Sequence, residues 1–122
     1  MMKFKFLVVL VACLFGGLAV SAQEDSPAQP VGGNSAFEEY LQEKMQYPEQ
    51  AKEMGIEGNV FAVFDVDEEG KLIDITITKG IGAGCDEEAL RLLENAPAWQ
   101  PAMRDGKPVR QRKSTLIRFR LP

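Results

Sequence analysis

Two stretches near the middle of the chain alternate apolar and polar residues with period two, the pattern of half-buried β-strands. The first runs from Asn59 to Val66 and the second from Lys71 to Lys79, with the polar turn segment 67–70 between them. This arrangement predicts a β-hairpin. A further alternating stretch, from Ser114 to Leu121, predicts a last strand. The residues expected on the inner faces of these strands are Val60, Ala62, Phe64, Val66, Ile73, Ile75, Ile77, Thr115, Ile117, Phe119 and Leu121.

A helical pattern begins at Ser35 and continues to Met45. Ser35 and Glu38 have the spacing of a capping box, in which each side chain satisfies a free backbone amide of the first turn. The apolar residues then recur at intervals of three and four, which predicts an amphipathic helix. The residues of its apolar face are Phe37, Tyr40, Leu41 and Met45.

Proline and glycine mark the ends of the other helical segments. Pro48 interrupts the first helix and suits the start of a short helix over 48–54, which Gly55 can close in the left-handed conformation. Asp86 is expected to cap a further helix that ends before Pro97, with Ala89, Leu90, Leu93 and Leu92 on its apolar face. The order helix, strand, strand, helix, strand predicts an α+β fold in which two helices cover one face of a three-stranded, mainly antiparallel sheet.

The first 22 residues have the layout of a cleavable secretory signal. Lys3 and Lys5 are followed by the apolar run 6–20, and Ala22 ends a small-residue segment ahead of polar residues. Two alternatives remain open: an uncleaved membrane anchor over 6–22, and lipidation at Cys13, which follows a sequence resembling a lipobox. Contact with a membrane is expected only in these two cases.

Residues 23–34 are polar and rich in proline and glycine, so they are expected to form a linker, and residues 35–122 the single domain. Twelve residues reach at most roughly 40 Å when fully extended, so this linker is no long spacer.

Charge is unevenly distributed after residue 22. Residues 23–103 contain 5 Lys/Arg and 17 Asp/Glu, a net charge of −12, whereas residues 104–122 contain 7 Lys/Arg and one acid, a net charge of +6. The acidic total of −6 argues against nucleic acid as a partner, because nucleic acid selects a basic face. The basic C-terminal segment suits either a solvated strand face or an acidic partner segment.

The residue inventory also argues against an enzyme. The chain has no histidine, which removes the constellations in which imidazole activates a serine or cysteine, and Cys85 would be the single cysteine after cleavage. One interpretation of Cys85 is a small hydrophobic residue buried in the core. The alternative is an exposed thiol that forms a disulfide between two chains. No cofactor is expected, because the glycines at 80–84 lack a phosphate-binding motif.

No metal site is expected either. Zinc is bound mainly by cysteine and histidine, and the mature chain would offer one cysteine and no histidine. Residues 65–70 resemble the first half of a calcium loop, but the twelfth position of that loop is Thr76 instead of glutamate. What remains is binding, and an exposed sheet edge is a template for adding a partner strand.

A series of residues along the chain resembles the C-terminal domain of TonB, the energy transducer of Gram-negative outer-membrane transport. The series comprises Gln46-Tyr47-Pro48, Ala51, the segment 55–60, Phe64-Asp65-Val66, Gly70, Glu88-Ala89, Trp99-Gln100-Pro101 and the segment 106–109. The resemblance covers about residues 31–122 and implies two helices on a three-stranded antiparallel sheet. It also implies a partner, the short TonB box of an outer-membrane receptor, which adds as a strand to the last strand of the domain.

Carried over by position, the resemblance implies a partner-binding site with two parts. One is the segment Gln46, Tyr47 and Pro48, and the other is the edge strand with Thr115, Ile117, Arg118, Phe119 and Arg120. A purely structural role for Tyr47, orienting two helices, is an equally open alternative.

The chain departs from full transducers, which have an uncleaved anchor and a long proline-rich spacer. We therefore expect a periplasmic, receptor-binding module. Two alternatives are a minimal transducer anchored in the inner membrane and a structural homodimer.

Overall fold

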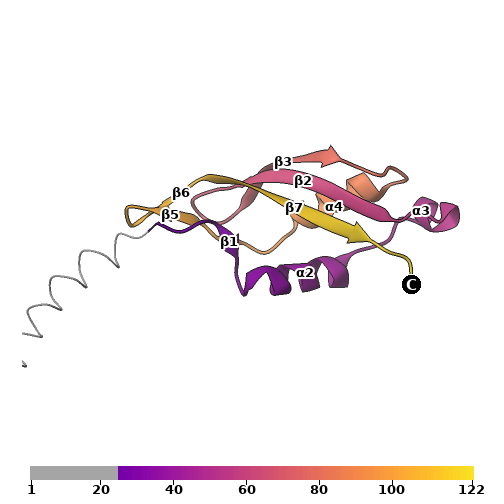
Figure 1. Ribbon diagram of the computed structural model, residues 1–122, viewed down its shortest axis with the longest axis horizontal. Helices are drawn as coiled ribbons and strands as arrows, with labels where there is room; N and C mark the ends of the chain where they lie inside the picture. Colours follow the sequence, from indigo (N-terminus) through magenta and orange to yellow (C-terminus); the bar gives the residue numbers. More distant parts are fainter. Residues whose placement is uncertain (1–24) are drawn as a thin grey trace, which may run out of the picture.

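The computed structural model describes residues 25–122 and is built around a three-stranded antiparallel sheet (Figure 1). Its strands are β2 (Gly58–Val66), β3 (Leu72–Lys79) and β7 (Gln111–Phe119), in the order β3-β2-β7. The hairpin β2–β3 and the last strand are confirmed, although β7 begins earlier, and ends earlier, than the segment 114–121 predicted. The molecule is the expected α+β fold.

Within residues 25–122, three helices accompany the sheet: α2 (Gly33–Lys44), the six-residue α3 (Glu49–Met54) and α4 (Cys85–Glu94). Helix α4 packs against β3 and β2, while α2 runs alongside β7 and approaches β1 (Figure 1). The short α3 is confirmed, with Gly55 as its left-handed cap at φ 66°.

The core contains most of the side chains expected on the inner faces of the strands, together with one face of each helix. Its largest fully buried members are Phe64, Phe119, Leu41, Leu92, Leu93, Ile117, Val60 and Val66. The prediction is wrong for Ile73, Thr115 and Leu121, which are half-buried and lie outside the core. Leu72 is buried instead of Ile73 because the register of β2 with β3 shifts there.

Four short strands extend this framework in the part of the chain that the structure describes. β1 (Gln29–Pro30) pairs with β4 (Trp99–Gln100), and β5 (Ala102–Arg104) forms a small hairpin with β6 (Lys107–Val109). The segment 25–30, expected to be linker, therefore lies against the domain: Ala28 is buried, and Ser26 exchanges backbone hydrogen bonds with Met103. The sequence pattern did not predict the pairing of β1 with β4, because two-residue strands are too short to show an alternation of apolar and polar residues.

The cap predicted for the first helix is wrong. Helix α2 begins at Gly33, and its N-cap is Gly32 in the left-handed conformation at φ 87°, without a side-chain hydrogen bond. Ser35 therefore lies inside the first turn. Glu38 is unavailable as the return arm of a capping box because its carboxylate bonds Arg118 on β7.

The cap predicted for α4 is also wrong. The helix begins at Cys85, after Gly84 in the left-handed conformation at φ 88°. Asp86 instead accepts hydrogen bonds from the backbone N–H groups of Ile81 (2.9 Å) and Gly82 (3.2 Å), so it fixes the loop that precedes the helix. Its carboxylate serves a loop because short acidic side chains bond nearby backbone amides in turns as readily as in caps.

The turn between β2 and β3 is locked to β4 by Gly70. Its φ is 85°, and the backbone N–H of Trp99 donates to the carbonyl of Gly70 at 2.7 Å. A Cβ atom at this position would lie 1.9 Å from the Trp99 carbonyl oxygen. Only glycine allows this approach.

The signal, anchor and lipidation hypotheses concern residues 1–22, which lie outside the described residues. Within 25–122, none of the helices has both the length and the apolar composition needed to cross a bilayer.

Candidate functional site

The last strand of the sheet, β7, is paired on one side only. Its register with β2 runs from Phe119 opposite Gly58 to Gln111 opposite Val66 without a shift. Among residues 25–122, no strand pairs with the other side of β7. Alternate N–H and C=O groups on that side therefore face away from the sheet, and an incoming strand would bond these groups.

Hollows separate β7 from the elements beside it, which are the segment 25–30 and helix α2. One of about 340 Å³ is lined by Phe37, Trp99 and the β7 residues 113–115, among others. The next, of about 220 Å³, lies between α2 and β7 and is lined by Asn34, Phe37, Glu38, Leu41, Thr115, Leu116 and Arg118. Hollows therefore border β7 between residues 113 and 118, whereas at the start of the strand the backbone N–H of Ala28 donates to Gln111 Oε1 at 2.7 Å.

The structure divides the predicted edge residues by face. Ile117 and Phe119 are fully buried, so only their backbone can take part at the edge. Arg118 and Arg120 are exposed, and Thr115 is half-buried beside α2. Arg120 lies just beyond the end of β7, where its guanidinium donates to the Phe119 carbonyl at 3.0 Å and to Asn59 Oδ1 at 3.2 Å.

The segment 45–48 is held by a carboxylate that the sequence reasoning did not select. Glu88 on α4 is 8% exposed and accepts the backbone N–H of Gln46 at 2.7 Å. The same carboxylate accepts two bonds from Arg91, at 2.8 and 2.7 Å, and Arg91 also donates to the carbonyl of Lys44 at 3.0 Å. Hydrogen bonding to Glu88 raises the pKa of Arg91. Glu88 and Arg91 thus fix the chain between α2 and α3.

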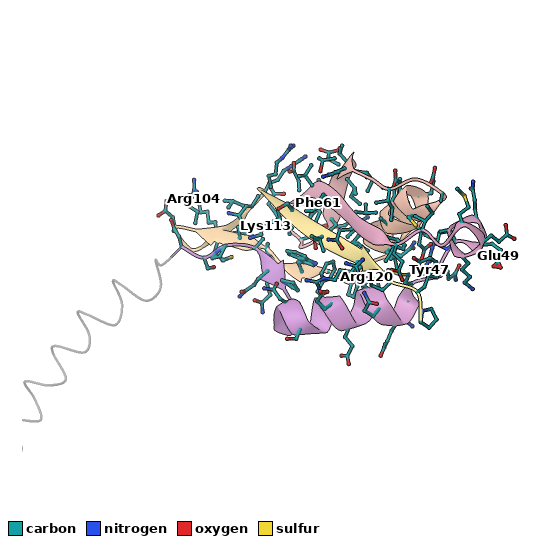
Figure 2. The ribbon with its side chains drawn as sticks, turned by 45° about the vertical axis from the view of Figure 1, so that its right-hand side comes forward. Tyr47, Glu49, Phe61, Arg104, Lys113 and Arg120 are labelled. Atoms are coloured by element: carbon teal, nitrogen blue, oxygen red, sulfur yellow. The ribbon has the colours of Figure 1, made fainter. Side chains whose placement is uncertain are left out.

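Tyr47 connects this segment to the end of β7. Its ring meets the Phe119 ring edge-on, with centroids 5.7 Å apart, and its hydroxyl donates to the carbonyl of Ile56. Burial raises the pKa of the Tyr47 hydroxyl, so this group stays a donor at neutral pH. Figure 2 shows Tyr47 beside Arg120, with Lys113 further along β7. These contacts support a structural role for Tyr47 at a position adjoining the free edge.

Gln46 and Pro48 flank Tyr47 with different roles. The Gln46 side chain is exposed, while Pro48 precedes α3 at φ −62°. Both line a shallow hollow of about 420 Å³ together with Tyr47 and α4 residues that include Glu88 and Arg91. The two predicted parts of the site therefore meet at Tyr47 and Phe119, whereas Thr115 lies further along the strand.

Basic side chains concentrate on and around β7. At its start, Arg110 and Arg112 bond the carboxylate of Asp65, with distances of 2.8 Å from Arg110 Nε and 3.2 Å from Arg112 Nε. The Arg110 hydrogen bond, partly opposed by burial, holds the pKa of Asp65 below its usual value. Lys113, Arg118 and Arg120 continue the positive charge along the strand. This distribution favours a partner that carries acidic groups.

Cys85 is buried and belongs to the core. Burial raises the pKa of its thiol, which keeps the sulfur protonated and unreactive. Of the two interpretations of this residue, the buried one is confirmed.

The fold and its free edge define a small α+β domain whose last strand is paired on one side only among residues 25–122. The sequence profile of the family described as "Gram-negative bacterial TonB protein C-terminal" matches residues 43–121. The chain belongs to this family of TonB C-terminal domains. No curated protein sequence matches it significantly.

One solved structure similar to this fold is described as "Solution NMR structure of Pseudomonas aeruginosa TonB CTD". The likeness has a TM-score of 0.52 and 21% sequence identity, and it covers 85% of this chain and 91% of that one. At this identity the comparison supports the fold alone.

Proposed function

We propose that this domain binds TonB-box segments of outer-membrane receptors by adding them as a strand to the free side of β7. The observation that carries the proposal is the unpaired β7 edge in a member of the TonB C-terminal family. Backbone bonds along β7 would supply affinity, and the hollows beside α2 would receive alternate side chains of the added strand.

The segment 46–48 extends this binding surface. Because Glu88 fixes Gln46 and the Tyr47 ring packs on Phe119, the exposed Gln46 side chain is presented near the end of β7. The exposed Arg118 and Arg120 lie at the same end of the strand. A box peptide would thus contact Gln46, Tyr47 and Pro48 in addition to the backbone at 115–120.

The proposal places the domain in the periplasm, where TonB-family domains act. In this proposal the domain is an interaction module in transport and not an enzyme. We propose that residues 1–22 are removed on export. N-terminal sequencing of the protein purified from its source would find Gln23 first; an intact Met1 would support the anchored-transducer alternative instead.

Strand addition can be tested without altering the protein. Fluorescence anisotropy would measure binding of labelled box peptides taken from the outer-membrane receptors of the source organism. Each peptide would also be made with N-methyl groups on every second residue, in the two possible phases. Only alternate amides of an added strand bond its neighbour, so one phase should abolish binding and the other should leave it. Equal affinity in both phases would exclude strand addition.

The contribution of the segment 46–48 is tested separately. Gln46→Ala combined with Tyr47→Ala should weaken peptide capture, and Gln46→Ala alone should weaken it without unfolding because that side chain is exposed. Ile117→Pro in β7 should also weaken capture, but Ile117 is fully buried. Circular dichroism must therefore show which variants are folded. Unchanged affinity in a folded Gln46→Ala variant would remove Gln46 from the site.

A structural homodimer is the other candidate, and the free edge of β7 is the feature that favours it. The buried Cys85 does not add a disulfide to it. Size-exclusion chromatography with and without reductant decides: a monomer in both conditions rules the dimer out.

A further inference from the structure

Among residues 25–122, one ion pair reaches from α2 to β7. Arg118 Nη1 donates to Glu38 Oε1 at 2.9 Å, although the two residues are separated by 80 positions in sequence. Both residues line the hollow of about 220 Å³ between the helix and the strand. The ion pair therefore bridges the two walls of this hollow.

The direction of the Arg118 side chain places this bridge at the strand edge. Arg118 lies between Ile117 and Phe119, which point into the core, so its side chain leaves from the opposite face of the sheet. Glu38 follows Phe37, a residue that α2 buries in the core. To meet Glu38, the guanidinium must pass round the unpaired side of β7.

An added strand needs the space that this contact crosses. Neighbouring strands lie roughly 4.8 Å apart, and directly opposed side chains on one face approach within about 5 Å. A residue placed beside Arg118 would therefore compete with Glu38 for the guanidinium. A partner can displace Glu38 from Arg118, because the side chains of Arg118 and Glu38 are 56% and 42% exposed and exposed ion pairs are weak.

We propose that the Glu38–Arg118 ion pair is a latch across the free edge of β7, and that a partner strand opens it best by presenting its own carboxylate to Arg118. The inference rests on the strand addition proposed above and specifies its partner: an extended segment with an acidic residue beside Arg118. Exchanging one carboxylate for another keeps Arg118 paired. A neutral strand has two unfavourable options. Either the Glu38–Arg118 ion pair stays in place and obstructs the strand, or the ion pair breaks and Arg118 is left without a carboxylate.

The test uses two capped, fluorescein-labelled peptides, Thr-Val-Glu-Val-Thr-Val-Thr and the same peptide with Gln in place of Glu. The full chain is titrated into each peptide, and binding is measured by fluorescence anisotropy. The wild type should prefer the Glu peptide by about two- to fivefold, the range expected for one exposed ion pair. Glu38→Gln should tighten both peptides by a similar factor. Arg118→Gln should erase the preference. The preference should also shrink in 1 M salt, where the screening length is about 3 Å.

Glu39→Gln is the matched control, since Glu39 is the exposed neighbour of Glu38 on α2 and its replacement makes the same change in net charge. It should leave both affinities unchanged. Equal binding of the two peptides, together with no effect of Glu38→Gln, refutes the latch and leaves strand addition standing. If neither peptide binds any variant while receptor box peptides do, the latch is again refuted. If box peptides fail as well, the proposed function itself is wrong.

Discussion

Glu88→Gln is the substitution that most directly tests how the segment 45–48 is positioned. The Glu88 carboxylate receives three donors: the Gln46 N–H and two N–H groups of Arg91. Glutamine has the same size but only one acceptor oxygen, so its NH₂ group must face a donor. The Gln46 N–H is the donor with the fewest alternatives, because it belongs to the backbone between two helices.

The magnitude follows from the bonds that are lost. A hydrogen bond to a charged group contributes about 1.5–3 kcal/mol, and Arg91 is exposed enough to recover part of its share from water. We expect Glu88→Gln to lower the free energy of unfolding by about 2 kcal/mol. For a domain of this size that corresponds to a fall in Tm of roughly 10 °C.

Urea and thermal unfolding followed by circular dichroism would measure this loss, with Glu87→Gln as the control. Glu87 is exposed and lies on the same helix, so its replacement makes the same charge change while the hydrogen bond from Gln46 to Glu88 stays in place. Amide exchange by NMR adds a local readout, in which the Gln46 N–H should exchange faster in Glu88→Gln alone. If Glu88→Gln and Glu87→Gln are equally stable and Gln46 keeps its protection, Glu88 does not hold this segment.

Three further predictions concern stability and reactivity. Gly70→Ala should lower the free energy of unfolding by at least about 2 kcal/mol in urea titrations, because the new methyl group meets the Trp99 carbonyl at a positive φ. Asp65→Asn should destabilise the protein at neutral pH, and its deficit against the wild type should shrink as the pH falls below about 4. This sign follows because Arg110 lowers the pKa of folded Asp65, so that its stabilisation is present above the unfolded pKa and lost on acidification; a pH-independent deficit would contradict it. Cys85 should resist alkylation in the native protein and react in urea, as mapped by mass spectrometry; rapid native labelling would show that its burial is transient.

The sheet was predictable from sequence because its signal is local. Alternation along 59–66, 71–79 and 114–121 is the direct mark of strands with one buried face, and the structure contains β2, β3 and β7 there. Gly55 was likewise recognised as a helix end because only a residue tolerant of positive φ suits that position.

The caps and the linker were not predictable in the same way, because their side chains take partners that are distant in sequence. Glu38 bonds Arg118 instead of its own helix. Residues 29 and 30 form a strand only because Trp99 and Gln100 lie beside them. Local rules describe the conformation that a segment prefers in isolation. Tertiary contacts override such conformational preferences, because each preference is weak.

The candidate site shows the same division. The positions of Gln46, Tyr47 and Pro48 came from a family resemblance, and the burial of Ile117 and Phe119 from alternation. The role of Glu88 was missed because its backbone partner lies 42 positions away. The spacing of Glu88 and Arg91 at i and i+3 was a visible sign of an ion pair on one helix face, but it did not indicate what the pair would hold.

The attachment of the segment 25–30 has a mechanical consequence. The chain enters the domain beside the β5–β6 hairpin, at the end opposite the segment 46–48 (Figure 1). Tension applied at residue 25 would first load the contacts of Asp25 with the β5–β6 hairpin and the Ser26–Met103 bridge, and then the two-residue pairing of β1 with β4. Contacts this short yield one after another, as in peeling, whereas the nine-residue strands β2 and β7 would share a load along their length. The entry segment is thus a compliant tether in series with a stiff sheet.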